Sequence, residues 1–245
     1  MRPLSAGQLL EAWERGLAET RWRRALPLLA VSSETSMEGA ASLSVGERDR
    51  RLLKLREWAF GSQLSSIADC ASCGERLEWM IDTTSFTSFP RQQAESQVDE
   101  MFERDDYNIT FRLPNTLDLE AVARSTDADA ARNVLLERCV TSVSKAGEQV
   151  GPAALPEVIT EGLAKRMAEV DSQADVEMDL TCPACGHRWQ ALFDIESFFW
   201  TEIHAWAQRL LSEIHLLACA YGWREKDILE LSPWRRQFYL GLVSG

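Results

Sequence analysis

The sequence lacks any long hydrophobic run, and no segment approaches the roughly 18–20 apolar residues that a membrane-spanning helix needs. The first residues, MRPLSAGQLLEAWERG, carry charges early and have no apolar core, so we expect no signal peptide. Positive charge is also scarce, because 26 Lys and Arg face 38 Asp and Glu and leave a net charge of −12. Such a surface repels phosphate backbones, so we expect no binding to nucleic acid. Because we expect neither a membrane span nor a signal peptide, we expect a cytoplasmic protein that does not bind membranes.

Recognisable catalytic motifs are absent as well. The chain has no P-loop, no G-x-S-x-G and no H-E-x-x-H pattern. Only three histidines occur, and two of them, His204 and His215, fall on one expected helix. Their separation along the helix axis is about 16 Å, so they cannot share a metal ion. We therefore expect a protein that is not an enzyme.

One short stretch occurs twice. The copies are CASCGERLEWMIDTTSF, which starts at Cys70, and CPACGHRWQALFDIESF, which starts at Cys182. Each begins with a C-x-x-C-G knuckle and continues into strand-like residues. Four thiolates suit the tetrahedral preference of a structural zinc ion, and cysteines in a reducing compartment seldom form disulfides. We therefore predict one structural zinc ion per chain, with the ligands Cys70, Cys73, Cys182 and Cys185.

Other interpretations of the cysteines are open. Buried free thiols would not explain the shared glycine or the matching flanks. A redox-active C-x-x-C pair is expected at a strand-to-helix turn, and neither pair is predicted at one. His187 could replace a cysteine, although with four thiols present we expect it to support the site from outside the ligand set. Cys139 and Cys219 fall in helical segments, where we expect core positions.

The spacing of the knuckles determines the expected fold. The 108 residues from 74 to 181 exceed what a compact zinc ribbon contains, so they include an insertion. We predict an α+β protein, mainly α-helical, in which helices flank a small antiparallel four-cysteine zinc ribbon. The expected regions are N-terminal helices at 1–62, the ribbon at 63–198 with a strand and helical insertion at 107–172, and C-terminal helices at 196–245. We expect them to form one interdependent globular unit.

Apolar periodicity and capping residues place the individual elements. Helices are expected at about 5–17, 20–31, 45–60, 117–124, 126–140, 156–170, 196–221, 225–231 and from 232 onward. Strands are expected at about 76–82, 107–113, 176–180 and 188–194. We expect a polar linker at 32–44 and an acidic, solvated loop at 95–106. The longest helix carries a core-facing stripe of Phe199, Ile203, Trp206, Leu210, Ile214 and Leu217.

The C-terminal stretch from Phe193 to Val243 contains a long helix ending in AYGW, a DILEL segment and an SPWRRQFYL helix. In these features it resembles the T-even phage baseplate hub assembly chaperone family. Relatives occur in contractile phages and in gene clusters of bacterial extracellular contractile injection systems. In the larger relatives CPxCG knuckles precede this region, and here the four cysteines correspond to them, with Ala71 where proline is usual. The FRLPNTLDL segment extends the resemblance more weakly over most of the chain.

The resemblance implies a non-enzymatic factor that helps to assemble a baseplate hub or spike of a contractile injection system. It leaves open the role of the ribbon and the N-terminal helices, which the short phage members lack. The surface expected to bind the partner comprises Trp223, Trp234, Arg235, Arg236 and Tyr239, in which tryptophans stand beside arginines as interface anchors often do. An aromatic lid over the core with solvated arginines explains the same pattern.

Two alternative functions stay open. The first is a zinc-ribbon nucleic-acid-binding or transcription-associated factor. The ribbon strands ERLEWMIDTTSF and HRWQALFDIESF are acidic or apolar, whereas ribbons that bind nucleic acid usually carry Lys and Arg there. The second is a permanent structural component of the baseplate, which would remain in the finished particle.

Overall fold

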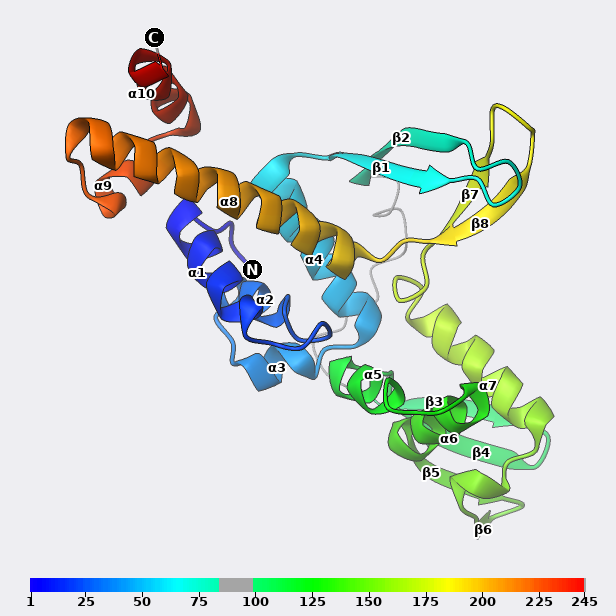
Figure 1. Cartoon of the computed structure of the whole chain (residues 1–245). Coiled ribbons are helices and arrows are strands. Elements are labelled where there is room, and N and C mark those ends of the chain that lie inside the picture. Colours follow the sequence, from blue (N-terminus) through cyan, green and yellow to red (C-terminus); the bar gives the residue numbers. More distant parts are fainter. Residues whose placement is uncertain (84–98, 245) are drawn as a thin grey trace. The chain divides into compact units, whose positions relative to one another are not determined.

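The computed structural model describes residues 1–83 and 99–244, and the chain folds as two units (Figure 1). Unit 1 comprises Met1–Met37 and Ile195–Gly245, and unit 2 comprises Glu38–Asp194. The predicted α+β class with small antiparallel sheets is confirmed. That both units form one interdependent globular unit stays a prediction. Among the described residues, no helix is long and apolar enough to cross a membrane.

Unit 1 is helical. Its helices are α1 (Ala6–Leu17), α2 (Leu26–Ser33), α8 (Ile195–Tyr221), α9 (Glu225–Leu229) and α10 (Pro233–Ser244). Ser5 caps α1 through a capping box, because its side chain accepts from the Gln8 N–H and the Gln8 side chain accepts from the Ser5 N–H. The second helix was expected from about residue 20, with a kink or a late start because of Pro27, and it does start late, at Leu26. Pro27 therefore lies in the first turn of the helix. Backbone N–H groups there have no partner within the helix, so proline, which lacks an N–H, breaks no hydrogen bond.

The core of unit 1 forms along α8. Five residues of the predicted stripe are buried and Trp206 is half-buried. α1 approaches α8 closely at Gly16, where a Cβ atom would lie 2.4 Å from both the Trp200 ring and the Arg24 carbonyl oxygen. The Trp13 indole donates to Nδ1 of His204 at 3.3 Å. His204 is thus a hydrogen-bonded neighbour of the core.

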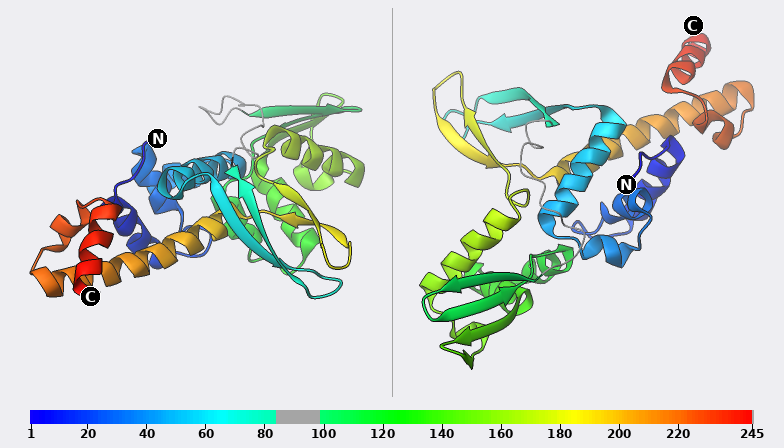
Figure 2. Two further views of the ribbon diagram at one scale, coloured as in Figure 1. Left: turned by 90° about the horizontal axis from the view of Figure 1, so that it is seen from above. Right: turned by 180° about the vertical axis from the view of Figure 1, so that it is seen from behind.

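Unit 2 contains the strands and the remaining helices. The helices are α3 (Met37–Ala41, of which the first residue belongs to unit 1), α4 (Val45–Phe60), α5 (Thr116–Val122), α6 (Ala128–Cys139) and α7 (Glu157–Val170), with a short 3-10 helix, η2, at Pro152–Ala154. One hairpin pairs β1 (Gln63–Asp69) with β2 (Arg76–Asp82), and another pairs β7 (Glu177–Thr181) with β8 (Arg188–Leu192). An antiparallel sheet has the order β3 (Glu100–Arg104), β4 (Tyr107–Phe111), β5 (Val140–Lys145) and β6 (Glu148–Gln149). Figure 2 shows the two hairpins side by side from two directions.

The four-stranded sheet and α7 have a core of their own. Alternate residues of β4 point to one face, and that face is buried against Ile159 and Leu163 of α7. The buried members of this core are Tyr107, Ile109, Phe111, Val140, Val143, Ile159 and Leu163. The expected insertion at 107–172 therefore buries apolar surface within itself and does not rely on the cysteines for a core.

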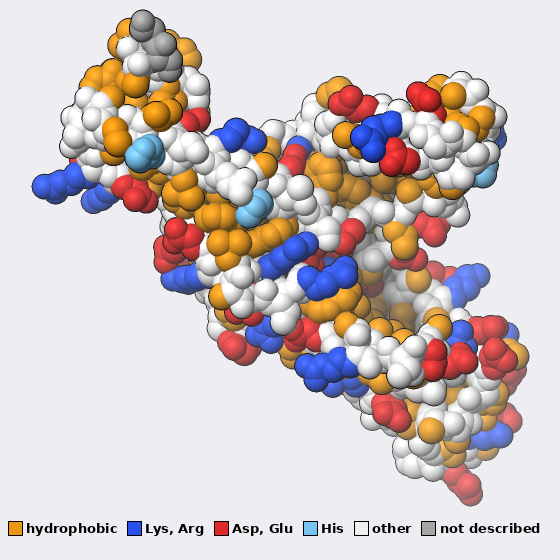
Figure 3. All heavy atoms as spheres, viewed as in Figure 1, with side chains coloured by type: hydrophobic (Ala, Val, Ile, Leu, Met, Phe, Trp, Pro, Cys, Tyr) orange, Lys and Arg blue, Asp and Glu red, His pale blue; other side chains and the backbone are white. Residues whose placement is uncertain are grey.

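The acidic segment at 95–106 was expected to be a solvated loop, and this is wrong for its described part. Residues 95–98 lie outside the described residues, but β3 pairs with β4 from Glu100 onward. Phe102 packs on the core of the sheet, while charged neighbours such as Glu103 face solvent. Figure 3 shows acidic side chains on the surface around this sheet. Charges on an edge strand are favourable because they discourage pairing with another chain.

Two other expectations are corrected. The linker at 32–44 contains α3, whose Ala40 and Ala41 are fully buried. The helix expected to reach Val140 ends at Cys139. The following residues, VTSVSK, include three β-branched side chains, which favour a strand, and they pair with β4 as β5.

Asp118 is fully buried and joins three elements of unit 2. Its carboxylate accepts from the Arg112 guanidinium at 2.6 and 2.9 Å and from Arg138 at 2.7 Å. It also accepts from the backbone N–H of Asn115 at 2.9 Å, which completes the cap of α5. Burial alone would raise the pKa of Asp118, but the hydrogen bonds from Arg112, Asn115 and Arg138 outweigh it and lower the pKa to about 2.

We expect Asp118→Asn to lower the free energy of unfolding by about 3 kcal/mol at neutral pH, because two arginines lose their carboxylate partner. Since the pKa of the folded carboxyl is below the unfolded value of about 3.9, this stability is present above that value and is lost as pH falls toward the folded pKa. The difference between variant and wild type should therefore shrink below about pH 4. Denaturant unfolding at several pH values measures it.

Asp105→Asn is the matched control, because Asp105 is exposed and its φ of 52° suits Asn as well as Asp. We expect it to change stability by less than about 0.5 kcal/mol. A destabilisation by Asp118→Asn that is the same at every pH would contradict the assigned role of the carboxylate.

Candidate metal centre

Two β-hairpins bring the four cysteines together. Cys70 and Cys73 lie in the turn between β1 and β2, and Cys182 and Cys185 lie in the turn between β7 and β8. The hairpin tips meet in both views of Figure 2. The two C-x-x-C pairs, which 108 intervening residues separate in the sequence, thus share one site, as their matching flanks indicate.

The two knuckles have the same backbone geometry. In the first, the Cys70 N–H donates to the Glu75 carbonyl at 2.9 Å and the Gly74 N–H donates to the Cys70 carbonyl at 2.8 Å. In the second, the corresponding bonds run from Cys182 to His187 and from Gly186 to Cys182, both at 2.9 Å. The glycines have φ of 73° and 74°, a left-handed conformation that explains why both copies require glycine there.

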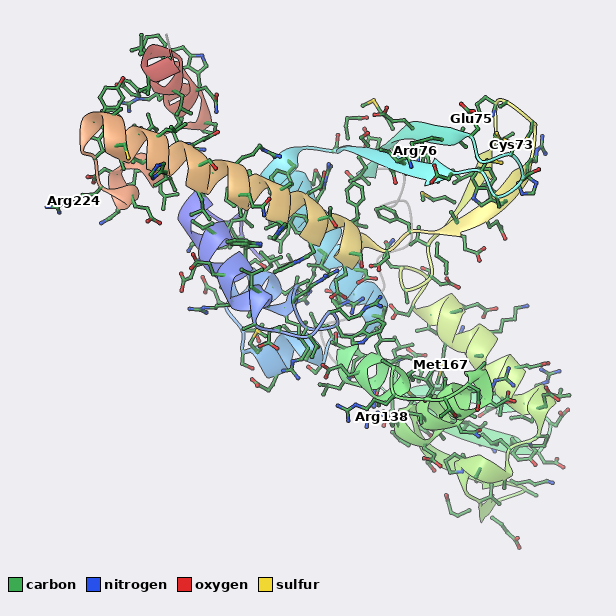
Figure 4. The ribbon with its side chains drawn as sticks, in the orientation of Figure 1. Cys73, Glu75, Arg76, Arg138, Met167 and Arg224 are labelled. Atoms are coloured by element: carbon green, nitrogen blue, oxygen red, sulfur yellow. The ribbon has the colours of Figure 1, made fainter. Side chains whose placement is uncertain are left out.

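An ion pair closes the first knuckle. Arg76 and Asp69 face each other across the hairpin, and Nε of Arg76 lies 3.0 Å from Oδ1 of Asp69. Figure 4 shows Arg76 with Cys73 and Glu75 near the tip of this hairpin. Because both side chains are exposed, the pair adds little stability, and the glycine turn is the main determinant of the knuckle.

The four sulfur atoms form a compact group. All lie within 4.8 Å of one another, with Cys70 Sγ 3.7 Å from Cys185 Sγ and Cys73 Sγ 3.6 Å from Cys182 Sγ. A tetrahedral zinc ion with Zn–S distances of about 2.3 Å would separate its sulfurs by about 3.8 Å. The two distances of 3.7 and 3.6 Å are close to this value, and the arrangement is compatible with a tetrahedral thiolate site. Each knuckle contributes one buried sulfur ligand residue and one exposed one.

The protonation of the thiols also favours a cation at this point. Burial would raise the pKa of Cys70, but the backbone N–H groups of Cys73 and Ser72 donate to its sulfur and lower the pKa to about 7. The backbone at Glu75 acts to lower the pKa of Cys73, but its hydrogen bonds to the neighbouring cysteines, above all Cys185, outweigh this and raise the pKa to about 12. A divalent cation would stabilise the charge of all four.

The donor set is closed and soft. Four thiolates complete the tetrahedral shell of a structural site and leave no position for water or substrate. Calcium and magnesium prefer oxygen ligands, so a thiolate-binding metal fits these residues better. His187 does not belong to the group of four, and its ring stacks on Trp189 at 5.7 Å.

The remaining cysteines differ from each other. Cys139 is fully buried, as predicted, and burial together with the nearby Asp118 carboxylate raises its pKa to about 12. The expectation that Cys219 is a core residue is wrong, because it lies exposed on α8 with its sulfur 3.8 Å from Nε2 of His215. It lies two residues after Leu217, the last buried residue of α8, and a two-residue step of about 200° turns its side chain to the opposite side of the helix.

Sequence reasoning missed β1, the strand that precedes the first knuckle. Its residues QLSSIAD have only Leu64 and Ile67 as large apolar side chains, and Ile67 is exposed. The internal repeat contained the missing signal. Since the second knuckle was predicted between two strands, the first copy should have had a strand on both sides as well.

The residues nominated for partner binding all lie in unit 1, and the structure places them differently. Trp234 and Arg235 are exposed, whereas Trp223 and Tyr239 are half-buried and pack edge to face at 5.0 Å. Arg236 is only 5% exposed, pairs with Glu213 and donates to the Leu231 carbonyl. Arg236 therefore fixes α10 to α8. Partner binding by these residues stays a prediction.

Comparison with known proteins gives one match. The model of the family described as T4 bacteriophage base plate protein matches residues 30–200. The matched range covers most of the chain and includes both knuckles, but not α9 and α10. No curated protein and no solved structure matched. The relationship to phage baseplate proteins that the sequence implied is confirmed, and the chain belongs to the T4 bacteriophage base plate protein family.

Proposed function

We propose that the protein is a non-enzymatic assembly chaperone or adaptor for the baseplate hub or spike of a phage-tail-like contractile injection system, held in shape by one structural zinc ion. The observation that carries this proposal is membership of the baseplate family over residues 30–200. A baseplate protein works by binding other baseplate proteins, so the partners would be hub or spike proteins. Assembly would take place in the cytoplasm, where a thiolate zinc site is stable.

The metal supports a structural role. Zinc bound by Cys70, Cys73, Cys182 and Cys185 would cross-link the two hairpins, and a closed four-thiolate shell supplies no Lewis-acid or nucleophile-generating position. Because β1 and β8 lie far apart in the sequence, the cross-link would hold both ends of the intervening sheet and helices. Closing a longer loop adds entropy cost only slowly, so the insertion is compatible with such a clip.

We expect about one zinc ion per chain and expect Cys182→Ser to lose it, because three thiolates bind far more weakly than four. Cys219→Ser is the matched control, since Cys219 is outside the cluster and should leave the zinc content unchanged. Elemental analysis of both purified variants measures this.

A strong chelator should lower the melting temperature of wild type, since metal binding contributes folding free energy. Metal-free protein with full thermal stability would contradict the zinc site.

We expect a pull-down of the tagged protein from its native host to recover hub, spike or other baseplate proteins. Recovery of only ribosomal or transcription proteins would instead favour the nucleic-acid alternative, which a salt-dependent mobility shift on DNA or RNA would support. Protein analysis of purified particles separates the remaining cases. An assembly chaperone should be absent from finished particles, whereas a permanent baseplate component should be present in fixed proportion.

A further inference from the structure

Helix α10 carries an apolar stripe that is exposed among the described residues. Trp234, Phe238 and Leu242 are 73%, 54% and 62% exposed and follow at intervals of four residues, so they share one face of the helix. Figure 3 shows hydrophobic side chains gathered over this part of the molecule. Large apolar side chains arranged in one exposed row mark an interaction surface more often than scattered ones do.

The stripe is held rigidly. Trp234 and Phe238 stack with ring centroids 5.7 Å apart, and Phe238 packs edge to face on Tyr239 at 5.9 Å. The helix is fixed to α8 through Glu213, which binds Arg236 at 3.2 Å and Gln237 at 2.6 Å. Side chains that are already ordered lose little entropy on binding, which favours their use as anchors.

Charge indicates what the partner must offer. The only charged residues of α10 are Arg235 and Arg236, and both lie in its first turn, where the helix dipole disfavours positive charge. Glu213 compensates Arg236, but among the described residues the exposed Arg235 guanidinium has no ion-pair partner. A carboxylate on the partner beside Trp234 would supply the missing compensation.

The acidic character of the chain does not extend to unit 1. Unit 1 contains ten Lys and Arg and ten Asp and Glu, so the whole net charge of −12 lies in unit 2, with its 16 basic and 28 acidic residues. A partner with an acidic rim would therefore meet a neutral unit and an uncompensated arginine when it approaches α10.

The space beside Gly241 would allow a partner to approach the helix closely. Gly241 lies in the interior of α10 beside Leu242, and a Cβ atom there would meet no atom of the described part of the chain within 4 Å. Glycine weakens a helix, and no neighbour in this structure requires it. A partner that closes around the helix would make use of the space.

The size of the stripe argues against a second copy as its occupant. The exposed parts of its three side chains amount to about 400 Å², given that a large aromatic side chain presents roughly 150–250 Å². A stable interface takes about 800 Å² from each partner. Pairing two such stripes face to face would bury too little, whereas a groove that encloses the helix also covers its flanks.

We propose that α10 is a docking helix whose Trp234, Phe238 and Leu242 side chains enter an apolar groove on a baseplate hub or spike protein, with Arg235 bound by a carboxylate at the groove's rim. The inference rests on the proposed function, since that function supplies the partner class. It names the surface and the mode of binding, a helix in a groove.

The test measures binding of the full chain to each hub and spike protein encoded in the same gene cluster, purified separately, by isothermal titration calorimetry. Trp234→Ala should weaken binding by about 30-fold or more, the factor expected for a hot-spot residue. Arg235→Glu should weaken it as well, and more at low salt than at high salt. Because both side chains are exposed, neither variant should lower the melting temperature.

Met80→Ala is the matched control, because Met80 is 70% exposed but lies on β2 of unit 2. It should bind like wild type. If a hub or spike protein binds wild type and both α10 variants equally well, the docking inference is overturned and the proposed function stands. If none of these proteins binds wild type, the proposed function fails and the inference fails with it. A wild-type dimer in sedimentation that Trp234→Ala dissociates would show that a second copy occupies the stripe.

Discussion

The meeting of four sulfur atoms within 4.8 Å is the constraint on which unit 2 depends. It requires residues 70–73 and 182–185 to return to one point, although a sheet and three helices separate them in the sequence. That intervening part buries Phe111, Val143 and Leu163 within its own core, so the burial of its apolar residues does not depend on the cysteines. The cysteine cluster therefore determines how the hairpins meet, while hydrophobic burial determines how the insertion folds.

Charge and apolar surface are distributed between the units in opposite ways. Unit 2 carries the net charge of −12, with acidic residues even on the edge strand β3. Unit 1 is neutral and carries the exposed row on α10. An acidic surface keeps a protein soluble and away from nucleic acid, whereas a neutral surface with ordered aromatic rings suits a protein partner. This division fits a factor that must bind its client at one surface and avoid binding elsewhere.

The sequence predicted most of what local chemistry determines. The start of α1 at about residue 5, the start of α6 at about residue 126, the apolar stripe of α8 and the two knuckles are all determined by residues close together in the chain. The missed elements depend on distant partners. β1 and β3 have few apolar residues and are strands because β2 and β4 pair with them, and β5 could not be separated from the end of α6 without its partner. Whether such short segments form strands depends on the strands that pair with them and on the side chains that pack against them.

Arg235 and Arg236 show the same limit at the level of single side chains. The sequence treats them as equivalent, since both follow Trp234 and both lie in one turn of α10. The structure gives them different roles, because Glu213, which lies 23 residues before Arg236 in the sequence, pairs with Arg236 and not with Arg235. Arg236 holds the helix in place, whereas the described residues show no such role for Arg235 or for the exposed aromatic row. In the unbound protein, contact of the aromatic row with water and the positive charge at the start of the helix are both unfavourable in free energy. A groove on a partner that covers the row and binds Arg235 would relieve both.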